Sequence, residues 1–163
     1  MKKIFKRILI ALLIIFIAIQ FIRPAKNQSE GISANDISTK YPVPDSIQAI
    51  LKVACYDCHS NNTRYPWYHQ IQPVTWWLNS HVMDGKRGLN FSEFTSYRIK
   101  KQFRRLNDIN ELVKKNEMPL SSYTLIHTDA KLSDPQKLAL ANWTKALKDT
   151  IKAQYPAESL LGK

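Results

Sequence analysis

The sequence feature that most constrains this chain is Cys55-Tyr56-Asp57-Cys58-His59, in which two thiols lie two residues apart and an imidazole follows at once. Thiols at this spacing lie on one turn of backbone, at about the separation of the two vinyl groups of haem, across which they add to form thioethers. The histidine comes directly after, so its ring can reach the iron as an axial ligand. The pattern therefore predicts one covalently attached haem c, held by Cys55 and Cys58, with His59 as the proximal ligand.

Three further chemistries use paired cysteines, and the sequence supports each of them less well. A thioredoxin-like dithiol is typical of a βαβ setting, which the pattern of apolar residues does not indicate. A structural zinc site needs four ligands and usually a second Cys/His pair, whereas this chain has only two cysteines. A disulfide between Cys55 and Cys58 is the third possibility, for an oxidising compartment.

The N-terminal part of the chain is basic and apolar. Residues 1–26 contain six cations and no acid, and they enclose an apolar run from Ile8 to Ile22 that is interrupted only by Gln20. A helix of fifteen residues spans about 22 Å, and its extension back to Ile4 approaches the roughly 30 Å of a hydrocarbon core. We therefore expect residues 1–23 to be a single uncleaved transmembrane anchor. A cleaved signal peptide is the alternative, but no small-x-small cleavage site follows the run.

The charges that flank this run also predict an orientation. Four cations precede it and two follow it, which favours a cytoplasmic N-terminus with the rest of the chain on the outer side of the membrane. This side agrees with the predicted cofactor, because haem of type c is attached after export. Without the first 26 residues the chain has 18 cations and 13 acids, a net charge of +5 against +11 for the whole. No basic cluster accompanies a nucleic-acid motif, so we expect no nucleic-acid binding.

The remaining sequence predicts one small all-α domain. Residues 24–43 are polar, contain scattered proline and glycine, and are expected to form a flexible linker. Residues 44–155 show helical spacing of apolar residues with almost no alternation of period two, and residues 156–163 are expected to form a tail. Helices are expected after Pro44, after Pro73 until Gly85 or Gly88, from Ser96 to about Lys115, and after a capping box at Ser133-Asp134-Pro135-Gln136. The lysines and arginines of the third helix are expected to face solvent.

Aromatic and basic residues follow the cysteine motif closely in the sequence. Arg64, Trp67 and Tyr68 lie in a predicted loop directly after His59. They are candidates to contact the haem, with Arg64 on a propionate and an aromatic ring over the porphyrin edge. The alternative is that the aromatic side chains belong to the core of a small domain.

The second axial ligand is predicted to be Met118, which lies in a loop between two helices, directly before Pro119. Proline biases the preceding residue to an extended conformation, and a methionine thioether opposite histidine raises the reduction potential of a haem. His81 is the first alternative ligand, since it falls on the apolar face of the helix after Pro73; its second interpretation is a hydrogen-bonded core histidine. The candidates after His81 are Met83, His127 and His69.

Taken in order, the helix, the Cys-Tyr-Asp-Cys-His motif, the Met-Pro loop and the aromatic-bearing final helix resemble a class I cytochrome c. More closely, the chain resembles the bacterial membrane-anchored haem-binding domain family of cytochrome c-like proteins. The matching stretches are 54–61, 64–68, 89–93, 117–119 and 122–127. One departure from ordinary cytochrome c is the long insertion between His59 and Met118, which carries the His81 helix.

The resemblance implies covalent haem c with Cys55, Cys58 and His59 in these roles and Met118 opposite, but it transfers no reaction. An iron bound by histidine and methionine has no open position, which indicates one-electron transfer rather than an enzyme, at the outer face of the bacterial cytoplasmic membrane. The redox partner is not identified by the sequence. A peroxidase-like haem enzyme and a haem-based ligand or redox sensor are the alternatives, with His81 or His127 over the iron.

Overall fold

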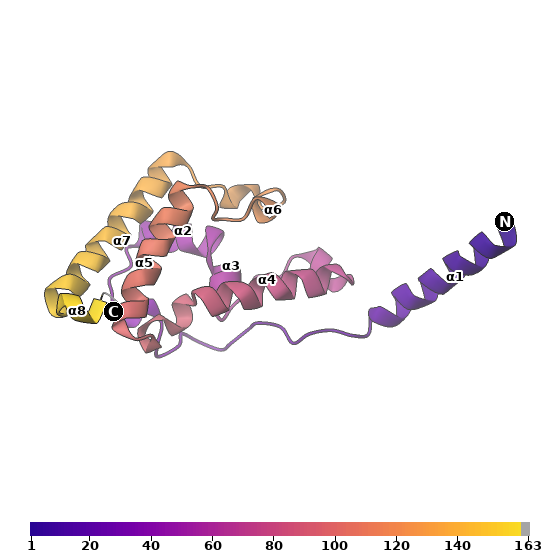
Figure 1. Ribbon diagram of the computed structural model, residues 1–163, viewed down its shortest axis with the longest axis horizontal. Coiled ribbons are helices and arrows are strands. Elements are labelled where there is room, and N and C mark those ends of the chain that lie inside the picture. The colour runs from indigo at the N-terminus through magenta and orange to yellow at the C-terminus, as the bar shows by residue number, and fades with distance from the viewer. Residues whose placement is uncertain (161–163) are drawn as a thin grey trace.

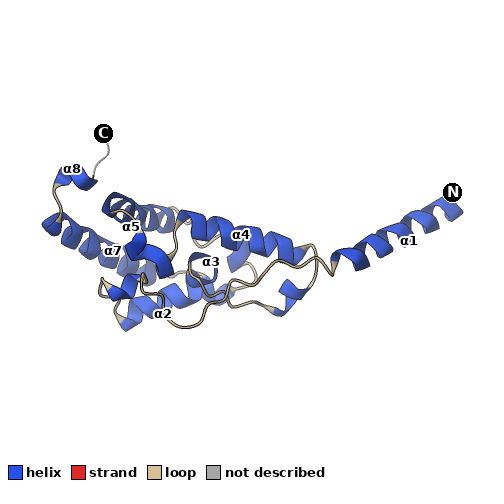
Figure 2. Ribbon diagram, turned by 90° about the horizontal axis from the view of Figure 1, so that it is seen from below, coloured by secondary structure: helices blue, strands red, loops and turns tan. Residues whose placement is uncertain are grey.

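The computed structural model describes residues 1–160, which form helices joined by loops, without a strand in that range (Figure 2). The predicted all-α class is confirmed. Residues 161–163 of the predicted tail lie outside the described residues. The α-helices are α1 (Lys2–Ile19), α2 (Asp45–Ala54), α3 (Tyr56–His59), α4 (Val74–Gly88), α5 (Ile99–Lys114), α6 (Ser121–Thr124), α7 (Asp134–Gln154) and α8 (Ala157–Leu160). The short 3-10 helices are η1 (Ile37–Thr39), η2 (Trp67–Gln70), η3 (Phe91–Ser96) and η4 (Thr128–Ala130).

The core of the domain lies where α5 and α7 pack side by side and α2 packs against α7 (Figure 1). The apolar stripe predicted for α2 is confirmed, and α7 begins at Ser133 with both hydrogen bonds of the predicted capping box. Burial of these apolar faces removes hydrocarbon from water and is the main stabilising contribution. The side chains that are almost fully buried here are Leu51, Leu106, Leu140, Leu147 and Ile151, with Phe91 and Phe94 from η3.

The third predicted helix begins later than the sequence indicates. The sequence predicts Ser96 as its cap, whereas α5 begins at Ile99 and Ser96 ends η3, donating its hydroxyl to the carbonyl of Glu93. The end of α5 agrees with the prediction, because Asn116 follows it in the left-handed conformation with φ of 58°.

Helix α1 projects away from the domain, and none of its residues is buried (Figure 1). It has 18 residues, a length of about 27 Å, and its first two turns carry Lys2, Lys3, Lys6 and Arg7. No helix within residues 1–160 is long and apolar enough to cross a membrane. The expected transmembrane helix over residues 1–23 is therefore not supported.

The segment expected to be a flexible linker, residues 24–43, is packed onto the domain. Ile37 is fully buried, and Tyr41 is buried with its hydroxyl donating a 2.6 Å hydrogen bond to Oε1 of Gln102. Asn27 donates from its amide side chain to the carbonyl of Ser60, just after the cysteine motif. The composition of this segment is mostly polar and does not reveal that Ile37 and Tyr41 are buried.

Candidate functional site

A cavity of about 310 Å³ lies between α3, α4, α5 and the segment 118–120. Its volume is within the range of cofactor and small-molecule sites, about 300–1,000 Å³. Cys55, Cys58, His59 and Met118 all line it, so the structure brings the predicted attachment residues and the predicted axial ligands to one place. Apolar side chains make up much of the remaining wall, namely Ala54, Leu89, Phe91, Ile109, Leu112, Val113, Pro119, Leu120 and Leu132.

The cysteine motif reaches this cavity because the chain bends after α2. Cys55 leaves helical geometry, with φ of −127° and ψ of −43°, and the single turn of α3 then begins. The amides of Cys58 and His59 both donate to the carbonyl of Cys55, at 3.2 and 2.9 Å. These bonds close one turn, so that both sulfurs and the imidazole face the same space.

The imidazole of His59 is fixed in one tautomer. Its Nδ1 lies 2.9 Å from the carbonyl oxygen of Leu89, and a carbonyl only accepts, so Nδ1 carries the proton. Burial lowers the pKa of His59, which keeps the ring neutral near pH 7. The lone pair is then on Nε2, free to bind a metal, with the ring held in orientation by the Leu89 carbonyl.

The two thiols are half-buried and free, with no disulfide between them. Burial, with a smaller contribution from Cys58, raises the pKa of Cys55 to about 12, and burial together with Asp57 raises the pKa of Cys58 to about 11. Reactive dithiols and zinc sites both need thiolates, and redox-active cysteines have lowered pKa values. No group of three or more potential metal ligands from His, Cys, Asp and Glu occurs within residues 1–160. The raised pKa values of the two thiols do not favour a redox dithiol.

Helix α4 approaches the motif very closely at Gly85. A Cβ atom at this position would lie closer than 3.0 Å to the carbonyl oxygen of Cys58, a distance at which something must shift. The sequence predicts a helix that ends at Gly85 or Gly88, and α4 does end at Gly88, with Gly85 in its last turn. The signal in the sequence is a glycine inside a helical pattern, which often marks close packing.

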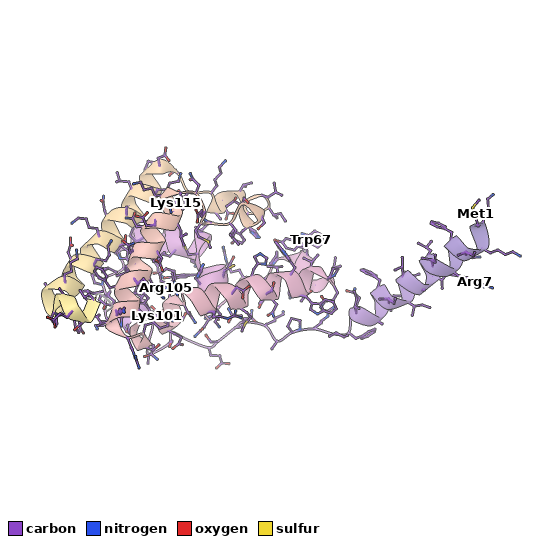
Figure 3. All side chains as sticks on the ribbon, viewed as in Figure 1. Met1, Arg7, Trp67, Lys101, Arg105 and Lys115 are labelled. Carbon is purple, nitrogen blue, oxygen red and sulfur yellow. The ribbon has the colours of Figure 1, made fainter. Side chains whose placement is uncertain are left out.

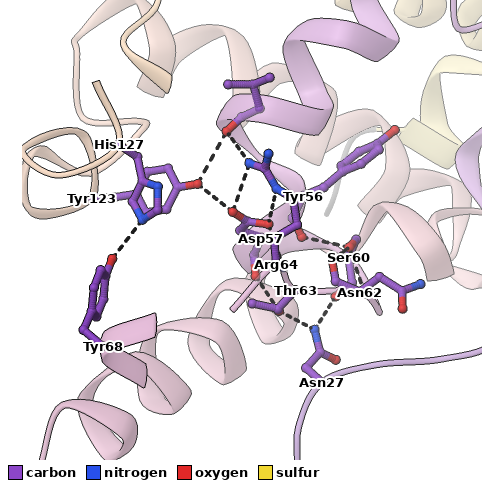
Figure 4. Close-up of polar contacts among 11 residues, drawn as sticks. Asn27, Tyr56, Asp57, Ser60, Asn62, Thr63, Arg64, Tyr68, Tyr123 and His127 are labelled. Atoms are coloured by element: carbon purple, nitrogen blue, oxygen red, sulfur yellow. Dashed lines mark hydrogen bonds and ion pairs between the residues drawn. The ribbon is translucent and has the colours of Figure 1, made fainter. Parts of the chain in front are cut away.

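Arg64 pairs with Asp57 and does not line the cavity (Figure 4). Its Nε lies 3.2 Å from Oδ1 of Asp57, and its backbone amide donates to the same oxygen at 3.0 Å. Tyr123 donates its hydroxyl to Oδ2 of Asp57 at 2.7 Å. Asp57 is itself buried, so it needs these donors, and this need explains why Arg64 turns toward the motif instead of the cavity.

Trp67 and Tyr68, the two aromatic residues predicted to contact the haem, also lie outside the cavity lining. Trp67 is 76% exposed, and its ring meets Tyr68 edge to face. The hydroxyl of Tyr68 and Nε2 of His127 are 2.8 Å apart, so these two side chains satisfy each other (Figure 4). The predicted haem contacts require Arg64, Trp67 and Tyr68 to reach the cavity. The structure places none of the three in its lining.

The candidates for the second axial ligand narrow to two. Met118 enters the cavity from the turn after α5, where the amides of Glu117 and Met118 both donate to the carbonyl of Leu112. His81 also lines the cavity; its Nδ1 donates to the carbonyl of Trp77 at 2.9 Å, so Nε2 is the ring nitrogen without the proton. The remaining candidates lie outside the cavity lining, namely Met83, His127 and His69.

Helix α5 adds a charged residue that sequence reasoning missed. The sequence places Arg105 on a solvent-facing basic surface, yet it lines the cavity and only 24% of its side chain is exposed. Its Nη1 pairs with Oδ2 of Asp108 at 2.8 Å, while Nε is buried without a hydrogen-bond partner among the described residues. One feature of the sequence distinguishes Arg105 from the other cations of α5. It lies at helical spacing from Gln102, Ile109 and Val113, which are all buried.

These residues fit a haem. The cavity offers two thiols, an imidazole with its lone pair on Nε2, mostly apolar walls, and a buried guanidinium N–H that lacks an acceptor within residues 1–160. A family described as a haem-binding domain matches residues 14–146. No curated protein and no solved structure gives a significant match to this chain. Because the family match covers most of the sequence, the chain belongs to the haem-binding domain family.

Proposed function

We propose that this chain holds one haem c through thioether bonds to Cys55 and Cys58, with His59 as proximal ligand, and works as a one-electron carrier. The observation that carries the proposal is the cavity that these three side chains share, in which the Leu89 carbonyl leaves Nε2 of His59 free to bind iron. A bound haem supplies one-electron exchange between its ferric and ferrous states.

The protein residues determine which chemistry remains possible at such a site. Met118 lines the same cavity from the segment that follows α5. A methionine thioether that binds haem iron together with a histidine raises the reduction potential of the haem. If His59 and Met118 both bound the iron, the protein would leave no position open for a substrate. The apolar walls exclude water, which further favours the ferrous over the ferric charge state.

We further propose that the domain works on the outer side of the bacterial cytoplasmic membrane, where haem of type c is attached. The support is the basic N-terminus followed by the apolar run from Ile8 to Ile22. Protease treatment of intact spheroplasts tests this location, because only an outward-facing domain is digested. A redox partner on that side is expected to present an acidic surface, since residues 27–163 carry a net charge of +5.

One observation favours a second candidate function. His81 lines the same cavity as His59, and its Nδ1, not its Nε2, bonds the Trp77 carbonyl. If Met118 does not bind the iron, a histidine over an open position would suit a peroxidase-like enzyme or a sensor of small ligands. High-spin spectra and rapid binding of carbon monoxide to the reduced protein would identify this case.

The test is the visible spectrum of the full chain, exported with the haem-attachment machinery, in both oxidation states. We expect low-spin spectra, the weak long-wavelength sulfur-to-iron band when oxidised, and pigment that stays with the polypeptide after denaturation. Met118→Ala should abolish the sulfur band, while Met83→Ala, at a half-exposed methionine outside the cavity lining, should keep it. Loss of covalent pigment is expected for Cys55→Ser with Cys58→Ser. Absence of any haem spectrum in the unmodified chain would refute the proposal.

A further inference from the structure

Arg105 is an unusual residue for the wall of an apolar cavity. It lies on α5 close to the C-terminal end of α4 (Figure 3). Its neighbour Arg104 is exposed, whereas the Arg105 side chain is mostly buried and lines the same cavity as His59. A guanidinium is charged at all physiological pH values, so this position brings a permanent positive charge into the site.

The hydrogen bonds of Arg105 are incomplete. Asp108, one turn further along α5, accepts from Nη1 at 2.8 Å, but Nε is buried and has no acceptor within the described part of the chain. An unmade hydrogen bond of a buried polar group costs about 1–3 kcal/mol, and more for a charged group. Because Arg105 lines the cavity, a ligand that fills the cavity can supply the acceptor that Nε lacks.

No further titratable side chain that lines the cavity takes this role. Asp57 is engaged by Arg64 and Tyr123, and Asp84 is exposed and pairs with Arg87. The imidazoles of His59 and His81 donate from Nδ1 to backbone carbonyls. The two thiols are neutral and are consumed by the proposed attachment. The acceptor is therefore expected to come with the ligand, and a positively charged donor favours an anionic one.

We propose that Nε of Arg105 donates a hydrogen bond to a propionate carboxylate of the haem, and that Arg105, rather than Arg64, is the propionate-binding arginine. The inference rests on the proposed function, because it assumes that haem occupies this cavity. Haem carries its two carboxylates at one edge of an otherwise apolar ring, which matches one arginine in a mostly apolar wall. Charge-assisted bonds between arginine and carboxylate are among the strongest in proteins.

The test is the reduction potential of the haem-loaded full chain, measured from pH 5 to pH 9 for Arg105→Gln. Without the guanidinium the propionate pKa rises, so the potential should begin to fall with pH inside this window. Loss of the positive charge also stabilises ferric iron, so the potential at pH 7 should drop. Arg104→Gln, next along the same helix and exposed, should match the unmodified protein.

Arg105→Lys keeps the charge without the Nε–H, and it provides the readout if Arg105→Gln does not fold. It should keep most of the potential at pH 7 while losing one slowly exchanging arginine Nε–H signal in the ¹⁵N spectrum of the reduced protein. An identical potential and pH profile for Arg105→Gln and Arg104→Gln would overturn the inference. Failure of the unmodified chain to bind haem would instead refute the proposed function.

Discussion

The hydroxyl of Tyr123 donates a hydrogen bond of 2.7 Å to Oδ2 of Asp57, the residue between the two cysteines of the motif. This bond joins the turn that holds the thiols to the segment that follows Met118. Because both residues line the cavity, the bond joins two parts of its lining. A change at Tyr123 should therefore act on the geometry of the site as well as on the stability of the fold.

Tyr123→Phe removes this bond and leaves a buried carboxylate with one donor fewer. We expect the free energy of unfolding to fall by about 1–3 kcal/mol, as for comparable buried groups left without a partner. Chemical denaturation monitored by circular dichroism measures it. Tyr155→Phe is the matched control, because its hydroxyl accepts only an exposed 3.3 Å bond from Lys40 and should change little. Equal losses for the two variants would contradict the role of the Tyr123–Asp57 bond.

Gly85→Ala should separate α4 from the motif turn, because the new Cβ would lie closer than 3.0 Å to the carbonyl oxygen of Cys58. Overpacking of this kind costs about 1–3 kcal/mol. Gly88→Ala in the same helix places its Cβ where no described atom lies within 4 Å, and alanine there should be neutral or slightly stabilising. Calorimetry of the two variants gives the melting temperatures to compare. A Gly85→Ala variant as stable as Gly88→Ala would show that the contact between α4 and Cys58 has room for a methyl group.

Ile37→Ala tests whether the segment before α2 is part of the fold. Ile37 is fully buried, so its truncation should cost about 2–5 kcal/mol in the free energy of unfolding. Ile32→Ala, in the same segment but 80% exposed, should have almost no effect. Urea titrations of the two variants under the same conditions give the comparison, and similar midpoints would mean that the segment does not contribute to the core.

The chain produced without haem should react slowly with iodoacetamide at pH 8. Thiolate is the reacting form, and the pKa values of Cys55 and Cys58, raised to about 12 and about 11, keep both thiols protonated. The rate should rise about tenfold per pH unit up to about pH 11, whereas in urea it should level off near the usual thiol pKa of about 8.5. Mass spectrometry of the alkylated chain follows both rates; equal rates at pH 8 would show that the thiols are not shielded.

The features that the sequence predicted correctly depend on neighbours along the chain. The motif, the apolar stripe of α2 and the capping box of α7 each lie within one or two helical turns, so their geometry follows from residue type and spacing alone. Cys55, Cys58, His59 and Met118 line one cavity, and their roles toward a haem stay predictions.

The features that the sequence missed depend on contacts between distant residues. Arg64 follows the motif by a few residues, but its position is decided by the burial of Asp57, which Tyr123 completes from a distant part of the chain. Arg105 lies in a basic helix where most cations are exposed, and only the packing of the helices around the cavity reveals which of them faces inward. Ile37 and Tyr41 are buried although they lie in a segment whose composition is mostly polar. Composition and the spacing of apolar residues do not reveal contacts between residues that are far apart in the sequence.

Two parts of the cavity lining come from segments about sixty residues apart, the motif turn at 55–59 and the segment 118–123. During synthesis or export the cysteines emerge well before the segment 118–123. The proposed thioether bonds would therefore form most readily while the motif is still an extended peptide, to which an attachment enzyme can bind. The prosthetic group would then act as a nucleus around which the later helices close, so that maturation and folding become a single ordered pathway.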